Sequence, residues 1–518
     1  MKSFYIPLLC AALCTSCNDF LDVKPVGKLI PTEVTQFENL LNNTNTLNYH
    51  LIDNNGECGV AFFGDNLYIS ENQAAYSYLS THPNLDRYAA YIYYEPFEDP
   101  TKTSYTWEWG VYRATGLFNN VIEGIEDLGM AEDEYAQGVI AQAKAGRAWS
   151  YLIGGLAYGP MYDPDGANDT RTIPYRTSSS PSEPNPQLST TAELFALLKE
   201  DLDYAVTYAP DYVANPCRAS KSAAYALRAM YHMYMRNWQD MYNDADEAWQ
   251  KALETKGGSV ANLLYDFNEF YYLPDESAVP QPGEDVEYYL ELRSNDGDRD
   301  FDKSYSRENL FYRTSPGGTG TYPSDDYLAL FDTEKDMRYR LFLLNRRGYS
   351  TTVGEVVYED GVRRYNMRGE KMINNQGITY PDLLLMRAEA QARLGQLTGA
   401  LSDLNLLRQY RYDNTMDTDL PGGSSMTQDQ LLEEILKERR REQPISSYQR
   451  VFDLRRYVLD AGKPWCKTSI THTVGTKSYS SPVNMESFQM QIKNTYIRYN
   501  PQWGLTEWEG TWDPKSAE

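Results

Sequence analysis

Cysteine and histidine are scarce in this sequence, with six cysteines and four histidines among 518 residues. Three of the cysteines fall within the first seventeen residues, and Cys58, Cys217 and Cys466 lie far apart. This spacing supplies neither a disulfide framework nor the paired ligands of a zinc site. The sequence therefore predicts no metal and no disulfide scaffold.

Motifs of catalysis are missing as well. The histidines are isolated, and there is no H-E-x-x-H pair, no P-loop, no G-x-G-x-x-G and no G-x-S-x-G elbow. We therefore expect a protein that is not an enzyme and that uses no cofactor.

Basic charge is also in short supply. The chain has 48 Lys and Arg residues against 73 Asp and Glu residues, which gives a formal net charge of -25. A surface of this sign repels phosphate backbones, so nucleic acid is not expected as a partner.

Near the amino terminus, no apolar run is long enough to span a bilayer. Residues 4–13 are apolar and follow Lys2, which is typical of a secretory signal and too short for a permanent span. Thr15 and Ser16 precede Cys17 as in a lipobox, although Cys14 stands where leucine is usual. We expect residues 1–16 to be a signal peptide and Cys17 to carry lipid that anchors the chain to a membrane. Ordinary secretion, with Cys17 incidental, is the alternative.

Helical periodicity is what the chain does have, most clearly over residues 379–411. Apolar residues at spacings of three and four predict two amphipathic helices, and Gly395 ends the first of them. Helices joined this closely pack antiparallel. The spacing of Leu394, Gly395 and Ala400 resembles the turn of a tetratricopeptide unit.

Further helices are expected on both sides of a mid-chain insertion. Thr190 with Glu193 and Thr427 with Gln430 form capping boxes that begin two of them. The expected helical scaffold comprises mainly residues 107–158, 190–255 and 380–442. Residues 32–42 are expected to form a short first helix.

Two regions lack a clear period and are rich in tyrosine, residues 51–106 and 260–377. Within the second, residues 286–293 alternate as a strand does, and residues 355–365 suggest a hairpin around Asp360 and Gly361. The segment after residue 444 is interpreted as irregular. The predicted fold is therefore mostly α, with tetratricopeptide-like helix pairs forming a scaffold, a loop-rich irregular half and a few short strands.

Two charged groups invite a functional reading. The cluster around residues 438–456 has no accompanying nucleophile or metal ligand, and we interpret it as a structural salt-bridge network. Its members are Glu438, Arg439, Glu442, Arg450, Asp453 and Arg456. The run of alternating aspartates over residues 296–302 is similar to a calcium loop. It lacks the sixth-position glycine and has Arg307 in place of the bidentate glutamate, so a solvated acidic loop is favoured and an adventitious calcium site stays open.

Several short motifs follow one another along the chain. They are Cys17-Asn18-Asp19-Phe20-Leu21-Asp22, Trp109-x-x-Tyr112 with Asn119-Asn120, Ala143-x-x-Gly146-Arg147-Ala148, Arg218-x-Ser220-Lys221, Arg387-Ala388-Glu389-Ala390 and Glu438-Arg439-Arg440-Arg441-Glu442 with Arg450. Taken in this order, they resemble the SusD/RagB family of outer-membrane nutrient-binding lipoproteins of Bacteroidetes. The resemblance covers almost the whole chain and is weakest in the mid-chain insertion. One departure is the stretch over residues 443–448, where the family usually has Glu-Gly before the arginine at position 450.

The resemblance implies a single SusD-like domain over residues 17–518, exposed at the cell surface and lipid-anchored in the outer membrane. It also implies capture of an oligosaccharide or polysaccharide and its delivery to a TonB-dependent, SusC-like transporter. Because sugar C–H faces stack on aromatic rings and sugar hydroxyls bind polar side chains, the chain's 44 tyrosines and 9 tryptophans suit such a ligand. The ligand residues we expect are Asp65, Asn66, Tyr68, Tyr94, Trp107, Tyr305, Tyr312 and Tyr322.

Two alternatives stay open at this stage. The same fold could bind a peptide or another non-sugar nutrient, because aromatic loops serve both. A surface glycoside hydrolase would need two carboxylates about 5–10 Å apart in a cleft, and no motif selects such a pair.

Overall fold

A computed structural model describes residues 31–43, 58–79, 85–274, 290–295, 305–314, 321–367 and 375–517. The signal segment, Cys17 and the aspartates of residues 296–302 lie outside these ranges. No helix within them is long and apolar enough to cross a membrane.

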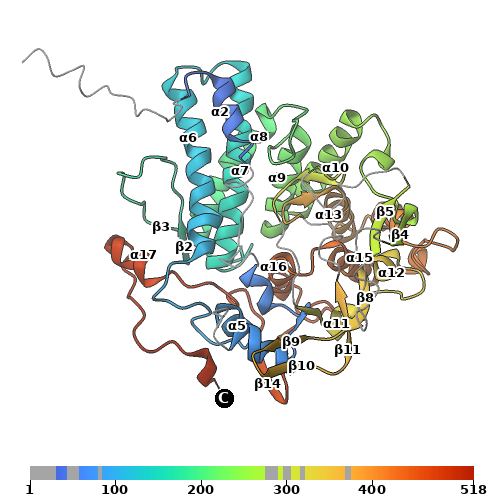
Figure 1. Ribbon diagram of the computed structural model, residues 1–518. Coiled ribbons are helices and arrows are strands. Elements are labelled where there is room, and N and C mark those ends of the chain that lie inside the picture. Colours follow the sequence, from blue (N-terminus) through green and yellow to red (C-terminus); the bar gives the residue numbers. More distant parts are fainter. Residues whose placement is uncertain are drawn as a thin grey trace, which may run out of the picture.

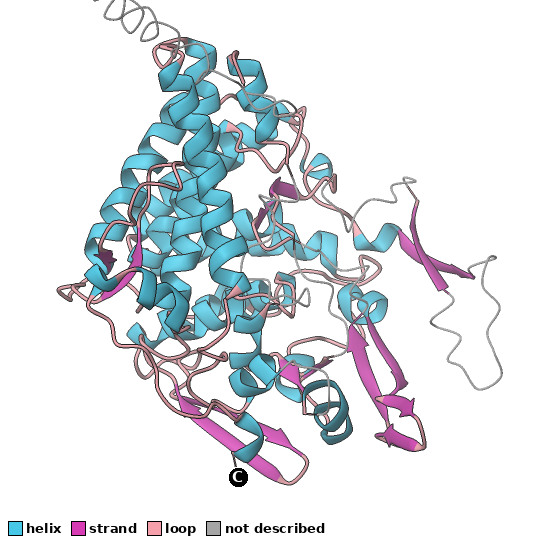
Figure 2. Cartoon of the chain, turned by 60° about the vertical axis from the view of Figure 1, so that its left-hand side comes forward, coloured by secondary structure: helices cyan, strands magenta, loops and turns pink. Residues whose placement is uncertain are grey.

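Helices form the bulk of the molecule and pack side by side through much of Figure 2. In Figure 1, α6 and α7 run together from the top of the view, and α9, α10 and α13 lie beside them. The mostly α fold expected from the sequence is confirmed. The long helices are α6 (Ala114–Asp127), α7 (Glu134–Tyr158), α8 (Thr191–Tyr208), α9 (Lys221–Met235), α10 (Trp238–Thr255), α13 (Tyr380–Arg393), α14 (Leu397–Arg411) and α15 (Gln428–Glu442).

Local signals set where these helices begin and end. The capping boxes of Thr190 and Thr427 are present as expected, and Thr379 with Asp382 forms a third. Gly395 has φ +78° and separates α13 from α14, a backbone conformation that side chains with a Cβ rarely adopt. Neighbouring helices then pack pairwise, as α7 does on α8, α9 on α10 and α13 on α14.

Shorter helical segments surround this scaffold. The first expected helix is present as α2, and a π-helix, η3, leads into α6. These segments are α2 (Val34–Leu40), η1 (Gly59–Phe63), α4 (Glu71–Gln73), η2 (Ala74–Tyr78), α5 (Leu85–Tyr91), η3 (Thr106–Arg113), η4 (Val260–Asn262), η5 (Phe267–Glu269), α11 (Asp325–Leu328), α12 (Met337–Phe342), η8 (Gly423–Ser425), α16 (Gln449–Arg456), η9 (Tyr457–Leu459), α17 (Asn494–Tyr499), η10 (Pro501–Trp503) and η11 (Pro514–Ser516).

Strands are short and form only two-stranded antiparallel pairs within the described ranges. Several of them lie along the lower and right-hand margins of Figure 2. Of the strand expected over residues 286–293, residues 290–293 belong to β5, and residues 286–289 lie outside the described ranges. The pairs are β1 (Leu67–Tyr68) with β7 (Tyr322–Pro323), β2 (Arg171–Pro174) with β3 (Leu188–Thr190), β4 (Phe270–Pro274) with β5 (Leu290–Ser294), β6 (Asn309–Phe311) with β12 (Ile378–Thr379), β8 (Leu343–Arg347) with β11 (Arg363–Met367), β9 (Ser350–Val353) with β10 (Val356–Glu359), and β13 (Ser469–Val474) with β14 (Lys477–Pro482).

The prediction of a hairpin turn at Asp360 and Gly361 is wrong. The turn lies instead at Gly354, which has φ +62° and joins β9 to β10, while β11 pairs with β8 beyond them. Asp360 and Gly361 interrupt one long ribbon, because three residues there oppose two on the other strand. Such an irregularity needs the same turn-forming residues as a hairpin turn, so the sequence alone does not distinguish the two.

The segment after residue 444 is more regular than expected. β13 and β14 form a hairpin in which alternate residues Ile470, His472 and Val474 are buried, followed by Gly475 with φ +60°. The period of two and the glycine are present in the sequence, but an alternation this short does not distinguish a strand from an irregular segment.

The charged cluster of residues 438–456 is a buried salt-bridge network, as predicted. Asp453 forms ion pairs with Arg439 at 3.0 Å and with Arg456 at 2.7 Å, and Arg456 forms a second ion pair with Glu389 at 2.6 Å. These side chains are almost fully buried and join α13, α15 and α16. The carboxylates compensate the guanidinium charges, which would otherwise be costly to bury.

Candidate ligand-binding pocket

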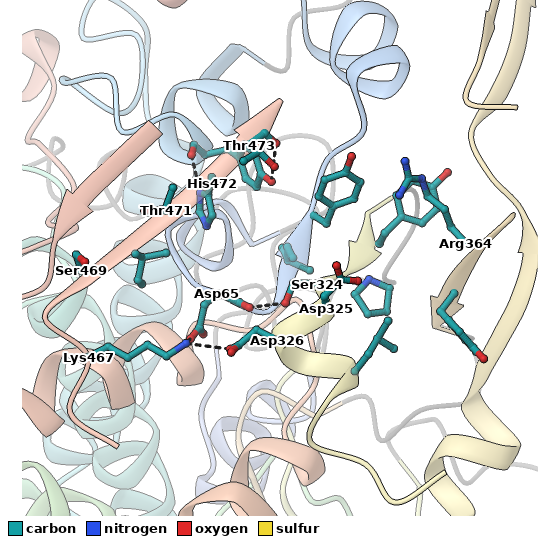
Figure 3. A pocket seen from close by; sticks show the side chains of 18 of the residues that line it. Asp65, Ser324, Asp325, Asp326, Arg364, Lys467, Ser469, Thr471, His472 and Thr473 are labelled. Atoms are coloured by element: carbon teal, nitrogen blue, oxygen red, sulfur yellow. Dashed lines mark hydrogen bonds and ion pairs between the residues drawn. The ribbon is translucent and has the colours of Figure 1, made fainter. Parts of the chain in front are cut away.

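A cavity of about 580 Å³ opens among four segments that are far apart in the sequence. These segments lie within residues 65–68, 322–328, 363–365 and 467–473, and Tyr91 of α5 adds to the lining. Side chains from all four surround the cavity in Figure 3. Its size is within the range of small-molecule sites, and its lining mixes aromatic with charged groups.

One wall carries two tyrosines and an arginine. Tyr68 of β1 and Tyr322 of β7 are directly paired in the ladder, with ring centroids 6.4 Å apart. The Cζ atom of Arg364 lies 4.8 Å from the Tyr68 centroid and 5.6 Å from the Tyr322 centroid. Asp360 orients this guanidinium by accepting a bond from its Nε atom at 3.0 Å. The result is an aromatic wall with a positive charge lying over its rings.

The floor of the cavity is formed by ion pairs between two aspartates and the cations around them. Arg450 donates to both oxygens of Asp65, at 2.7 and 2.8 Å. Arg440 approaches Asp65 at 3.2 Å, and Lys467 lies 2.6 Å from Asp65 and 2.9 Å from Asp326. Figure 3 shows Lys467 pointing at both carboxylates.

These cations keep both acids ionised. Burial acts to raise the pKa of Asp65, but Arg450, Arg440 and Lys467 hold that pKa well below its usual range. Asp326 is half exposed, and its pKa is also lowered, because Arg440 and Lys467 outweigh the effect of its burial.

The remaining wall is the strand β13. His472 is stacked on the rings of Tyr91 and Tyr93, at 4.2 and 4.9 Å between centroids. Its Nδ1 lies 2.6 Å from the carbonyl oxygen of Tyr91 and its Nε2 lies 2.9 Å from that of Gly64. Burial lowers the pKa of His472 despite these carbonyls. The histidine therefore ties β13 to the loop before β1.

Three of the eight expected ligand residues come together here, namely Asp65, Tyr68 and Tyr322. Asn66 lies behind them, almost fully buried, and its Oδ1 accepts a bond from Nε of Arg440 at 2.8 Å. It supports the pocket without lining it.

The other four lie elsewhere. Tyr94 packs edge-on against Trp512, with 6.4 Å between ring centroids. Trp107 is buried among aromatic rings and borders a separate cavity of about 390 Å³. Tyr305 is 70% exposed, and Tyr312 is buried, with its backbone N–H donating to the carbonyl of Pro216.

Sequence reasoning missed the residues that supply most of the polar lining. Arg364 lies in the predicted hairpin, which carries no expected ligand residue, and Lys467 and Thr471 lie in the segment interpreted as irregular. The alternation of residues 469–474 was the available signal, but nothing local linked it to Tyr68 about 400 residues away.

Comparison with known families identifies the chain. A family model described as "SusD family" matches residues 348–507, and one described as "Starch-binding associating with outer membrane" matches residues 19–233. No curated protein matches the sequence.

Solved structures share the fold at low sequence identity. A SusD superfamily protein of Bacteroides vulgatus has a TM-score of 0.60 and 16% identity, with 90% of this chain and 97% of that chain covered. A SusD-like carbohydrate binding protein of the same species has a TM-score of 0.56 and 15% identity over the same shares. A SusD superfamily protein of Bacteroides thetaiotaomicron has a TM-score of 0.56 and 17% identity, with 81% and 88% covered.

Helical scaffold, family models and solved neighbours agree, and the chain belongs to the SusD/RagB-like family. One of the family models is described as starch-binding and as associating with the outer membrane.

Proposed function

We propose that this chain captures an oligosaccharide or polysaccharide at the cell surface and delivers it to a SusC-like, TonB-dependent transporter. Lipid on Cys17 would anchor it in the outer membrane. The delivery step, the anchor and the surface location rest on membership of the family, and the binding step rests on the pocket.

The observation that carries the binding step is the aromatic wall. A pyranose ring presents C–H groups on its faces, which pack on a tyrosine ring, while its hydroxyls bind polar groups at the edge. Tyr68 is partly exposed and supplies the ring, and the nearly buried Tyr322 supports it from behind. Arg364, Lys467 and Thr471 supply polar groups around the same cavity. Asp65 holds Lys467 and Arg450 in place beneath them.

The charge state of the two acids supports binding without hydrolysis. A glycoside hydrolase needs one carboxylic acid that is protonated and able to donate to the leaving group. Asp65 and Asp326 share Lys467 and both have lowered pKa values, so neither is poised to donate a proton.

The test is affinity electrophoresis of the purified chain in gels that contain single polysaccharides, with Tyr68→Ala in parallel. Loss of the ring removes its packing on the sugar, and we expect binding about 5–30-fold weaker, as for a central interface residue. Trp107 is less suitable, because its burial would mix folding with binding.

Tyr499→Ala is the matched control, since Tyr499 is 78% exposed on α17 and lines none of the cavities described here. It should bind as the unmodified chain does. Equal weakening of both variants would refute the assignment to this pocket. Retardation by no polysaccharide at all would refute glycan capture and direct attention to peptides.

A further inference from the structure

Arg364 is unusual among the arginines around the pocket, because its terminal nitrogens are open. Arg440 and Arg450 are paired with carboxylates on the floor. Arg364 uses only Nε, toward Asp360, and neither Nη atom has a hydrogen bond or ion pair to another described residue. Its side chain is 29% exposed and lines the cavity.

The open edge of Arg364 suits a second anion. A guanidinium has two edges, and the edge formed by Nη1 and Nη2 matches two oxygens of a carboxylate or sulfate. Asp360 occupies the other edge and fixes the plane of the group. The guanidinium also lies over the rings of Tyr68 and Tyr322, of which Tyr68 is the more exposed, so an anion on Arg364 would be carried by a sugar ring resting against Tyr68.

The acids of the cavity do not prevent this. Asp65 and Asp326 are already compensated by Arg440, Arg450 and Lys467, and Asp325 is exposed to solvent, where its charge is screened. The lining of the cavity contains as many basic side chains as acidic ones. Behind the lining, two arginines, Arg440 and Arg450, face a single further acid, Asp360. The chain as a whole has a net charge of -25, so this balance of positive and negative charge is a property of the pocket and not of the whole sequence.

A neutral sugar would use the arginine poorly. Asp360 supplies a counter-charge at the Nε edge only, so covering the Nη edge with uncharged groups removes water there without a charged partner, which is costly. A carboxylate or sulfate supplies that charge and also accepts two hydrogen bonds.

We propose that the pocket selects an acidic glycan, one whose sugar units carry a carboxylate or a sulfate, and that Arg364 binds this group. The inference rests on the proposed function and narrows its ligand class. The described chain then combines a stacking surface for the ring with an anion site beside it.

The experiment measures affinity for acidic polysaccharides and for neutralised forms of the same backbones. Probes are polygalacturonate, alginate, hyaluronan, chondroitin sulfate and carrageenan, each beside its carboxyl-reduced or desulfated product, with starch, xylan and galactan as neutral glycans. We expect binding to at least one acidic probe and at least about 10-fold weaker binding to its neutralised form, as for a charged contact in a partly closed site. Loss on carboxyl reduction or on desulfation identifies which anion is bound.

Two variants assign the anion to its residue. Arg364→Gln should lose most of the preference for the acidic form. Arg364→Lys should retain part of it, because lysine keeps the positive charge but lacks the two parallel N–H donors of the guanidinium. Arg113→Gln removes an equal charge from an exposed arginine that packs on Trp109 and does not line the cavity, and it should leave binding unchanged. Thermal unfolding confirms that each variant is folded.

The outcomes separate this inference from the function on which it rests. Binding to neutral glycans, or equal binding to acidic and neutralised forms, would overturn the acidic ligand and leave glycan capture intact. An acidic preference that persists in Arg364→Gln would overturn the role of this arginine. Absence of binding to any glycan would overturn both proposals.

Discussion

At the scale of single residues, stability depends on buried charges that have no access to water. Asp453 accepts bonds from Arg439, Arg456 and Gln443, at 3.0, 2.7 and 3.0 Å. Burial acts to raise its pKa, but the two arginines and the amide lower that pKa from 3.8 to about 2. The ionised form is therefore the one that the fold stabilises.

Asp453→Asn should destabilise the chain by about 2–4 kcal/mol at neutral pH, because it leaves two buried guanidinium groups undercompensated. A carboxyl with a lowered pKa stabilises the fold above its unfolded pKa, and this contribution is lost as the pH falls through the folded pKa. The difference between the two chains should therefore shrink from about pH 4 to about pH 2. Urea unfolding at a series of pH values measures it.

The control is Asp429→Asn, which breaks an exposed pair with Lys463. Its effect should stay within about 1 kcal/mol, as for surface pairs generally. A loss at Asp453 that did not change between neutral and acid pH would contradict the titration argument.

Residue chemistry alone revealed part of the pocket. Aromatic and polar types pointed to Tyr68, Tyr322 and Asp65, because these types suit sugars wherever they occur. The same reasoning selected Trp107, which the fold uses in a buried aromatic cluster. Arg364 could not be selected, since its open edge depends on Asp360 and on the pairing of β11 with β8 across residues 343–367.

At the scale of elements, the sequence was most informative where structure is set locally. Helix caps and spacings of three and four gave the scaffold, including the turn at Gly395. The pairs β1 with β7 and β6 with β12 join two or three residues across long stretches of chain, too short to show a period. Such strands form because tertiary packing brings them together.

The turn between α13 and α14 gives a prediction about backbone conformation. Gly395→Ala should destabilise by about 1 kcal/mol, since φ is +78° and no atom of another described residue comes within 4 Å of a Cβ placed there, so that only the backbone is strained. Gly116→Ala on α6 also meets open space but has no positive φ, and it should stabilise by up to about 1 kcal/mol. Urea midpoints should move in opposite directions. A shift of both midpoints in one direction would contradict this account.

At the scale of the whole molecule, the amino-terminal and carboxyl-terminal parts of the chain contribute to one hydrophobic core. A single cluster of buried apolar side chains extends from Cys58 to Trp503 and includes residues of α7, α9, α13 and α16. Ion pairs also join distant parts of the chain, since Arg450 and Arg440 reach Asp65 across nearly 400 residues. The family models match separate stretches of the sequence, but the fold does not separate them in space.

This continuity predicts that the chain unfolds as one cooperative unit. A calorimetric scan should show one main transition, with a van't Hoff enthalpy close to the calorimetric enthalpy, because neither half can lose its side of the core alone. The smaller apolar cluster formed by α2, α6 and α7 shares α7 with the main core and should melt with it. Asp453→Asn should lower the temperature of that one transition without splitting it. Two well-separated transitions, of which only one moved in the variant, would show instead that the amino-terminal and carboxyl-terminal stretches are independent domains.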